Sequence, residues 1–210
     1  MSSIEDYILS HIDEEGELLR QLNRDAHVNL LRPRMLSGHL QGRTLKMLCR
    51  MIRPQSVLEI GTYTAYATLC MAEALEPNAM IHTIEINDEL EDFIRKYLDR
   101  TDLKDRIRLY IGDALKIIPT MNETFDLVFI DADKRLYSEY FDLVFDKVEP
   151  QGFIIADNTL WDGKILDGTQ HSDRQTIGIK DFNDKIAANT NVEKVILPLR
   201  DGLTIIRKNP

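Results

Sequence analysis

Acidic and amide side chains follow two apolar runs of the sequence, at the points where each run ends. Leu127–Ile130 is followed at once by Asp131, and Phe153–Ala156 is followed by Asp157 and Asn158. Apolar runs of this kind are typical of strands buried on both faces of a parallel sheet, whose carboxyl edge binds ligands. Two carboxylates and an amide oxygen at that edge predict a site for Mg²⁺, Mn²⁺ or Ca²⁺. The alternative is that each acid caps the helix or loop that follows it.

A lysine, Lys134, comes three residues after the first acid, in Asp131-Ala132-Asp133-Lys134. A lysine can take a proton from a hydroxyl group when burial and a neighbouring cation lower its pKa. The pattern therefore makes Lys134 a candidate general base. The alternative is a surface lysine paired with Asp133.

Three earlier strands are also expected to end in residues that suit a nucleoside. Gly61 would let the backbone approach a ligand closely, Glu85 could bind ribose hydroxyls, and Asp113 could accept an adenine amino hydrogen. A tight turn without a ligand, a solvated strand end and a helix cap are the respective alternatives. A dinucleotide is disfavoured, because its fingerprint needs three glycines at fixed spacing and Gly61 stands alone.

The elements that position these residues alternate along the chain after Pro54. Strands are expected at 56–60, 80–85, 107–111, 127–130, 152–156, 192–197 and 203–206, and helices at 66–75, 89–99, 114–120 and 137–147. This alternation predicts an α/β fold with a doubly wound, mostly parallel sheet. Asp201-Gly202 is a turn signal, so the last two strands should form an antiparallel hairpin. This is the arrangement of class I methyltransferases, a Rossmann-like fold, rather than of a pure dinucleotide-binding fold.

Composition narrows the class of protein further. The chain has 210 residues, 43% of them hydrophobic, and a net charge of −9. That size fits one domain, and that charge argues against a nucleic-acid partner or an anionic membrane surface. We find no signal peptide and no run long enough to span a membrane. Cys49 and Cys70 lie in apolar helical patterns and are expected to be buried free thiols, which favours the cytoplasm.

Several motifs together resemble one family, the cation-dependent O-methyltransferases, which include the caffeoyl-CoA and catechol O-methyltransferases, and most of all its small bacterial members. The resemblance covers roughly residue 30 to the end. It rests on Val57-Leu58-Glu59-Ile60-Gly61-Thr62-Tyr63-Thr64-Ala65-Tyr66, Gly112-Asp113-Ala114-Leu115, Phe125-Asp126-Leu127-Val128-Phe129-Ile130-Asp131-Ala132-Asp133-Lys134, Asp157-Asn158-Thr159-Leu160-Trp161 and Leu197-Pro198-Leu199-Arg200-Asp201-Gly202-Leu203-Thr204. Residues 1–210 would then form one methyltransferase domain, with 1–53 as a helical lid and dimerisation segment and 54–210 as the doubly wound core.

The resemblance also implies roles for individual residues. Asp131, Asp157 and Asn158 would hold the divalent cation, most often Mg²⁺, and Lys134 and Asp131 would be catalytic. The methyl donor would be S-adenosylmethionine. Its contacts would be Leu36 and Ser37 over the methionine end, Glu59, Gly61, Thr62 and Ala67 on the methionine side, Glu85 at the ribose, Asp113 and Ala114 at the adenine, and Asp131.

The chain departs from the family pattern at two small residues and in one segment. Ala65 stands where many members have glycine, and Ala67 where many have a serine that contacts the cofactor carboxylate. The segment 162–178 differs from that of the plant enzymes, so substrate identity does not carry over. Candidate acceptor contacts are Lys134, Trp161 as a wall for an aromatic ring, and His39 near the lid.

The chemistry favours a particular acceptor. Mg²⁺ takes six oxygen ligands, so three protein ligands and one water leave two positions, which two vicinal hydroxyls of a catechol would fill. The prediction is methyl transfer from S-adenosylmethionine to a small catechol-like acceptor by a homodimeric enzyme. The alternatives are a nicotinamide-dependent oxidoreductase and a non-catalytic protein that binds an adenosyl ligand.

Overall fold

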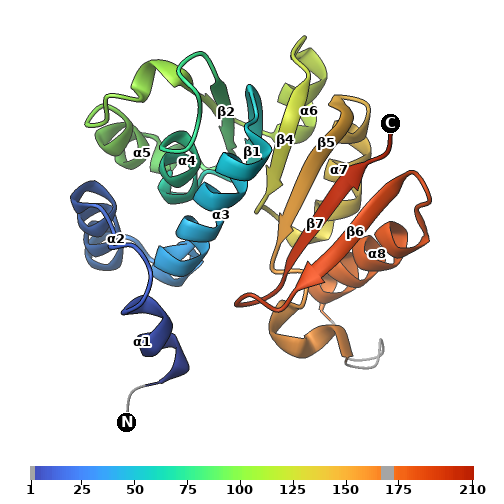
Figure 1. Cartoon of the computed structure of the whole chain (residues 1–210), viewed down its shortest axis with the longest axis horizontal. Helices are drawn as coiled ribbons and strands as arrows, with labels where there is room; N and C mark the ends of the chain where they lie inside the picture. The colour runs from blue at the N-terminus through green and yellow to red at the C-terminus, as the bar shows by residue number, and fades with distance from the viewer. Residues whose placement is uncertain (1–2, 167–172) are drawn as a thin grey trace.

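A single seven-stranded sheet organises the described part of the chain, which comprises residues 3–166 and 173–210 of a computed structural model (Figure 1). The strand order is β3-β2-β1-β4-β5-β7-β6. Strands β1 to β5 pair in parallel, whereas β7 runs antiparallel to both β5 and β6. The strands are β1 Ser56–Ile60, β2 Met80–Glu85, β3 Ile107–Ile111, β4 Phe125–Ile130, β5 Val148–Asp157, β6 Val192–Leu197 and β7 Leu203–Lys208. This confirms the predicted class I methyltransferase sheet with its C-terminal antiparallel hairpin.

Strand β5 begins four residues earlier than predicted. Residues 149–151 are exposed, and the pairing register with β4 shifts between Phe125 and Leu127. Gly152 follows these residues, and a Cβ atom there would come within 2.8 Å of the Glu149 carbonyl oxygen. Pro150 in an exposed polar stretch gives a weak strand pattern, so the sequence indicated only residues 152–156.

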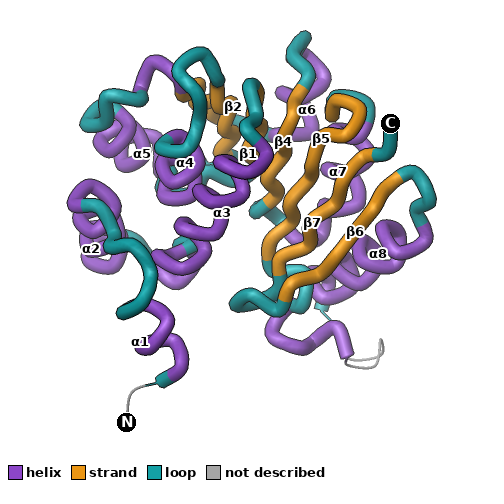
Figure 2. Tube along the Cα trace, in the orientation of Figure 1, coloured by secondary structure: helices purple, strands orange, loops and turns teal. Residues whose placement is uncertain are grey.

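Helices cover both faces of the sheet (Figure 2). The α-helices are α1 Ile4–Leu9, α2 Glu17–Asn29, α3 Gly38–Ile52, α4 Tyr66–Ala72, α5 Glu91–Leu98, α6 Ala114–Ile117, α7 Tyr137–Phe145 and α8 Arg174–Ala188, and the 3-10 helices are η1 Pro33–Met35, η2 Asp88–Leu90, η3 Lys104–Arg106, η4 Ile118–Thr120, η5 Lys134–Leu136 and η6 Trp161–Leu166. The four helices predicted between the first five strands are present. The prediction missed α8, although it buries residues at helical spacing, namely Thr176, Ile179, Phe182 and Ile186.

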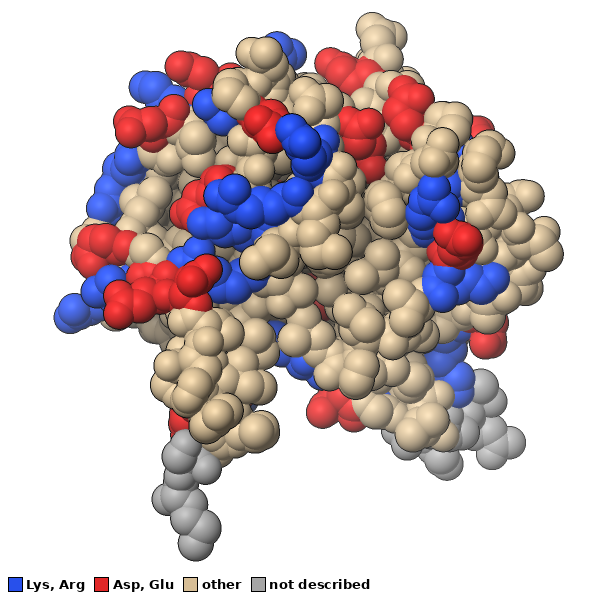
Figure 3. All heavy atoms as spheres, viewed as in Figure 1, with Lys and Arg blue, Asp and Glu red and all other residues tan. Residues whose placement is uncertain are grey.

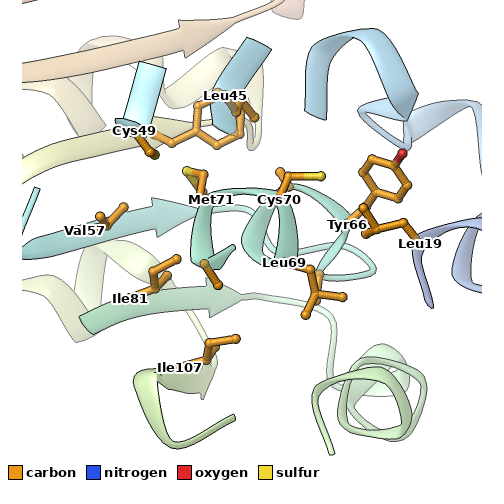
Figure 4. Close-up of a cluster of buried hydrophobic side chains, with 14 of the residues drawn as sticks. Leu19, Leu45, Cys49, Val57, Tyr66, Leu69, Cys70, Met71, Ile81 and Ile107 are labelled. Atoms are coloured by element: carbon orange, nitrogen blue, oxygen red, sulfur yellow. The ribbon is translucent and has the colours of Figure 1, made fainter. Parts of the chain in front are cut away.

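Two hydrophobic clusters lie on opposite faces of the sheet, because side chains alternate along each strand. Val57 and Ile81 face a cluster formed with α2, α3, α4 and α5 (Figure 4), whereas Leu58 and Ile84 face one formed with α6, α7 and α8. Cys49 and Cys70 lie in the first cluster as free buried thiols, as predicted. The central strands are therefore covered on both sides, and their carboxyl ends are held rigidly.

The described residues contain no helix that is both long and apolar enough to cross a bilayer. Acidic and basic side chains are interspersed on the face shown in Figure 3.

Candidate active site

The carboxyl ends of the parallel strands meet at one edge of the sheet. In the register of the sheet, Ile60 pairs with both Ile84 and Ile130, and Ile130 pairs with Ala156. The residues that follow these positions therefore lie beside one another. They border a cavity of about 570 Å³, whose walls include Gly61, Glu85, Ala114, Asp131, Lys134, Asp157, Asn158 and Trp161.

Asp157 and Asp131 form the acidic end of this cavity. Asp157 is 3% exposed, and its Oδ1 accepts a hydrogen bond from the backbone N–H of Asn158 at 2.8 Å. Burial, and secondly the negative charge of Asp131, raise the pKa of Asp157 to about 6. Two carboxylates that repel each other in a buried site suit a divalent cation, which would offset both the repulsion and the burial cost.

The donor set also fits a hard cation. Among residues 3–166 and 173–210, no group of three His, Cys, Asp or Glu side chains could hold a metal ion. A third protein ligand beside Asp131 and Asp157 would therefore be the amide oxygen of Asn158, which follows Asp157 and lines the same cavity. Asn158 has a φ of 57°, a left-handed conformation that asparagine tolerates better than most residues.

The helix caps at this edge are other residues. Asp133 caps η5 by accepting from the N–H of Arg135, and Asp113 caps α6 by accepting from the N–H of Leu115. Asp131 instead accepts a hydrogen bond from Lys134 Nζ at 2.9 Å. The alternative that Asp131 and Asp157 serve as caps is therefore not what the structure shows.

Lys134 is buried, with 6% exposure, and its ammonium group lies within the site. Besides Asp131, it donates to the hydroxyl of Tyr137 at 2.6 Å. The alternative pairing with Asp133 is wrong, because Asp133 pairs with Arg135 instead. Helix α8 packs against η5, the short helix that begins with Lys134, and Gly178 of α8 lies against the Lys134 carbonyl oxygen.

Tyr137 joins both strand ends to the lysine, and the sequence analysis did not single it out. Its buried hydroxyl lies 3.2 Å from the carbonyl oxygen of Ile130 and 3.0 Å from that of Asp157. The hydroxyl can therefore accept from Lys134 while it donates to one of these carbonyls. Burial, and secondly the charge of Asp131, raise the pKa of Tyr137 well above its ordinary value, so the phenol stays protonated.

Gly61 and Glu85 follow or end the neighbouring strands β1 and β2 and line the same cavity, with Gly61 next to Asp131. Gly61 has a φ of 99°, and a Cβ there would overlap the backbone carbonyl of Asp131. Glu85 is 6% exposed, and its carboxylate accepts from the N–H groups of Tyr63 at 2.7 Å and Asn87 at 2.9 Å. These bonds fix the carboxylate in the cavity wall and leave lone pairs for further donors.

A smaller adjoining cavity brings together four more of the predicted cofactor residues. Leu36 and Ser37 from the N-terminal segment line it together with Thr62, Ala67 and Asp131. Ala65 caps α4 with a φ of 66°. Glycine adopts that conformation without strain, whereas alanine bears a cost of about 1–2 kcal/mol.

Glu59, predicted on the methionine side of the cofactor, lines neither cavity. Its side chain is fully buried and accepts from the hydroxyls of Thr68 and Thr83, the latter at 2.6 Å. Burial raises the pKa of Glu59 to about 8, against the opposing effect of these two bonds. Glu59 therefore supports the glycine turn from inside the core.

Of three other predicted site residues, one lies in a cavity wall and two do not. Trp161 lines the large cavity, as expected of a wall for the acceptor. Asp113 and His39 line neither cavity: Asp113 caps α6, and His39 Nε2 lies 2.7 Å from the Asp13 carbonyl oxygen. Within the substrate-facing segment 162–178, residues 167–172 lie outside the described part of the chain.

Gln41 and Arg200 also belong to this region, and the sequence analysis missed both as site residues. Gln41 is 1% exposed and donates to Asp157 Oδ2 at 2.6 Å, and Arg200 lines the cavity and donates to Gln41 Oε1 at 2.9 Å. They are far apart in sequence from Asp157, and no local sequence pattern sets them apart from their neighbours.

The sheet, the acidic cavity end and the lysine together define a class of enzyme. The O-methyltransferase family model matches residues 9–209, and the chain belongs to this family. A catechol O-methyltransferase of Niastella koreensis is 33% identical over 203 residues, which cover 94% of this chain and 90% of that protein. A caffeoyl-CoA O-methyltransferase of Petroselinum crispum is 33% identical over 179 residues, covering 80% of this chain and 74% of that protein.

A solved structure agrees with these relatives. The O-methyltransferase TomG from Streptomyces achromogenes, crystallised in complex with SAM, superposes with a TM-score of 0.92 at 27% identity. The match covers 100% of this chain and 97% of that one.

Proposed function

We propose that the protein transfers a methyl group from S-adenosylmethionine to one hydroxyl of a small catechol-like acceptor, with a divalent cation. The observation that carries the proposal is the pair of carboxylates, the buried Asp157 and the half-buried Asp131, which shares one cavity with the buried Lys134. The names of the catechol and caffeoyl-CoA O-methyltransferase relatives support the same acceptor class.

The methyl donor fits the end of the site opposite Asp157. Glu85 presents a carboxylate for the ribose hydroxyls, while Gly61 leaves space for close approach of the ligand. Ala114 would contact the adenine, and Ser37 would cover the methionine end. The SAM complex of TomG supports this assignment.

The cation would be held by Asp131, Asp157 and Asn158, which supply two carboxylates and an amide oxygen. When bound, it would orient the acceptor and lower the pKa of the hydroxyl that it contacts. Mg²⁺ is the expected ion, because its preference for oxygen ligands matches this set.

The chain's own groups then prepare the acceptor for transfer. As the neutral amine, Nζ of Lys134 would take the proton of the attacking hydroxyl and become an ammonium group, and Tyr137 and Asp131 hold that nitrogen in place through their hydrogen bonds. Trp161 would bound the aromatic ring, and the N-terminal segment would exclude water. Since the donor carries its methyl group on a sulfonium, alignment and desolvation provide much of the remaining acceleration.

A labelled-donor assay tests the proposal. The protein should transfer radiolabelled methyl groups from S-adenosylmethionine to catechols when Mg²⁺ is present. Chelator should abolish transfer, while calorimetry shows that S-adenosylhomocysteine still binds. Methyl transfer at an unchanged rate in excess chelator would refute the cation mechanism, and a screen with no methylated catechol would refute the acceptor class.

The first 53 residues are proposed to act as lid and dimerisation segment of a cytoplasmic homodimer. Exposed apolar side chains are concentrated there: Ile4 and Tyr7 on α1 and Met47 and Met51 on α3 are each more than half exposed. Helices α1 and α3 contact each other, and exposed apolar side chains on neighbouring helices are typical of a subunit interface. Light scattering should give twice the monomer mass, and a Met47→Glu, Met51→Glu double variant should be monomeric. A wild-type monomer at micromolar concentration would refute this proposal.

A further inference from the structure

One chain of hydrogen bonds links the turn of the C-terminal hairpin to the acidic end of the cavity. Arg200 in that turn donates to Oε1 of Gln41 at 2.9 Å, and Gln41 donates through Nε2 to Oδ2 of Asp157 at 2.6 Å. We infer that Gln41 and Arg200 are positioning residues that fix the Asp157 carboxylate for the divalent cation. This inference rests on the proposed function.

The orientation of the Gln41 amide follows from its two partners. A guanidinium group has only donors, so the amide must turn its oxygen toward Arg200. Its NH₂ group is then left facing Asp157, which as a carboxylate can only accept. Arg200 thereby prevents the amide from turning its oxygen toward the carboxylate, where two acceptors would repel each other.

Both oxygens of Asp157 are held by this arrangement. Oδ2 receives the Gln41 bond, and Oδ1 receives the backbone N–H of Asn158 at 2.8 Å. One donor on each oxygen fixes the rotation of the carboxylate and leaves lone pairs on both oxygens for a cation. Gln41 is 1% exposed, so water does not compete for its amide.

Arg200 is itself held by both the hairpin turn and the lid. The Asp201 and Gly202 carbonyl oxygens accept from the N–H groups of Leu160 and Thr159, at 2.9 and 3.1 Å. The guanidinium also donates to the Ser37 carbonyl oxygen. The arginine therefore bridges the strand end that carries Asp157, through the turn, and the segment that would cover the methyl donor.

The test measures binding of Mn²⁺ alone to the full-length protein, by the electron paramagnetic resonance signal of the free ion. Wild type should bind one Mn²⁺, and Asp157→Ala should abolish that binding. Gln41→Met keeps the size of the side chain but removes the amide, and it should weaken Mn²⁺ binding by about 10-fold or more, the usual effect of losing a partner of a metal ligand. Circular dichroism and the melting temperature establish that each variant is folded.

Variants of arginine separate positioning from general structure. Arg200→Met should weaken Mn²⁺ binding, whereas Arg200→Lys, which keeps a donor for the amide oxygen, should recover much of the affinity. Arg207→Met is the matched control, because Arg207 lies in the same hairpin but bonds to Gln151 and Glu193. It should bind Mn²⁺ as wild type does.

The outcomes also distinguish this inference from the proposed function. Wild-type Mn²⁺ affinity in Gln41→Met would overturn the inference alone, as would equal losses in Arg200→Met and Arg200→Lys. Calorimetry with S-adenosylhomocysteine should show unchanged affinity in Gln41→Met, and an equal loss of both ligands would mean a collapsed site and overturn the positioning role. Failure of the wild type to bind Mn²⁺ would refute the proposed cation site together with the inference.

Discussion

Replacing Gly178 by alanine should slow catalysis by moving the lysine segment. A Cβ at this position would lie 2.5 Å from the carbonyl oxygen of Lys134 and 2.7 Å from the Cα of Arg135. Ordinary contact begins near 3.4 Å, so α8 or η5 must move by roughly 1 Å, because packed backbone cannot compress. A displacement of that size at a reacting group can lower turnover by about 100-fold.

The stability change should be smaller than the catalytic change. Alanine favours a helix interior over glycine by about 1 kcal/mol, and overpacking costs about 1–3 kcal/mol. The net loss of up to about 2 kcal/mol corresponds to a melting temperature lowered by up to about 8 °C in a chain of this size.

Steady-state kinetics, calorimetry and a thermal melt test this reasoning together. The affinity for S-adenosylhomocysteine should be unchanged, since its proposed contacts Gly61 and Glu85 are at the ends of β1 and β2, which do not pack against Gly178. Asp181→Ala, an exposed change in the same helix, is the control and should behave as wild type. A Gly178→Ala protein with wild-type turnover and melting temperature would show that Gly178 does not position Lys134.

Three further predictions concern single side chains of the site and its support. Glu85→Ala should cost about 1.5–3 kcal/mol of S-adenosylhomocysteine binding, because a charged hydrogen-bond partner is lost, and calorimetry showing normal affinity would contradict the ribose assignment. Lys134→Ala should lose about 10²–10⁴-fold in turnover near pH 7 and regain part of it toward pH 10, where a phenol ionises unaided; a loss that is constant with pH would exclude proton removal by Lys134. Glu59→Gln should be more stable than wild type at pH 9 and similar at pH 4. The pKa of Glu59 is raised from 4.5 to about 8 in the folded protein, so the unfolded chain releases its proton first and stability falls as pH rises between these values. Denaturant unfolding should show a difference of a few kcal/mol, about the size that such a shift implies, and parallel pH profiles would refute the argument.

The fold could be predicted largely because its strands carry local signals. Buried strands such as β4 read as continuous apolar runs, and Asp201-Gly202 marks the hairpin turn. Helix α8 was missed although its buried residues have helical spacing, because Gly178, a weak helix former, stands within it. That glycine is required by a contact with Lys134, which is distant in sequence.

In the candidate site, too, residues marked by their sequence neighbours were predicted, whereas residues that depend on contacts between distant parts of the chain were not. Asp131, Asp157 and Asn158 directly follow apolar runs, so the sequence placed them at one edge of the sheet. Gln41 reaches Asp157 across 116 positions, and no local pattern contains that contact. Glu59 was assigned to the cavity by resemblance, whereas it lies within β1, which helices cover on both faces, and its side chain is in the core.

The overlap between Gly61 and the Asp131 carbonyl has a consequence for engineering the enzyme. The turn proposed to carry the donor and the strand end proposed to carry the cation are in direct contact, with no side chain between them. Libraries that vary position 61 should therefore damage both functions at once, and such variants would give no information about either alone. The acceptor wall at Trp161 comes from the separate segment η6, so changes of acceptor preference are best sought there.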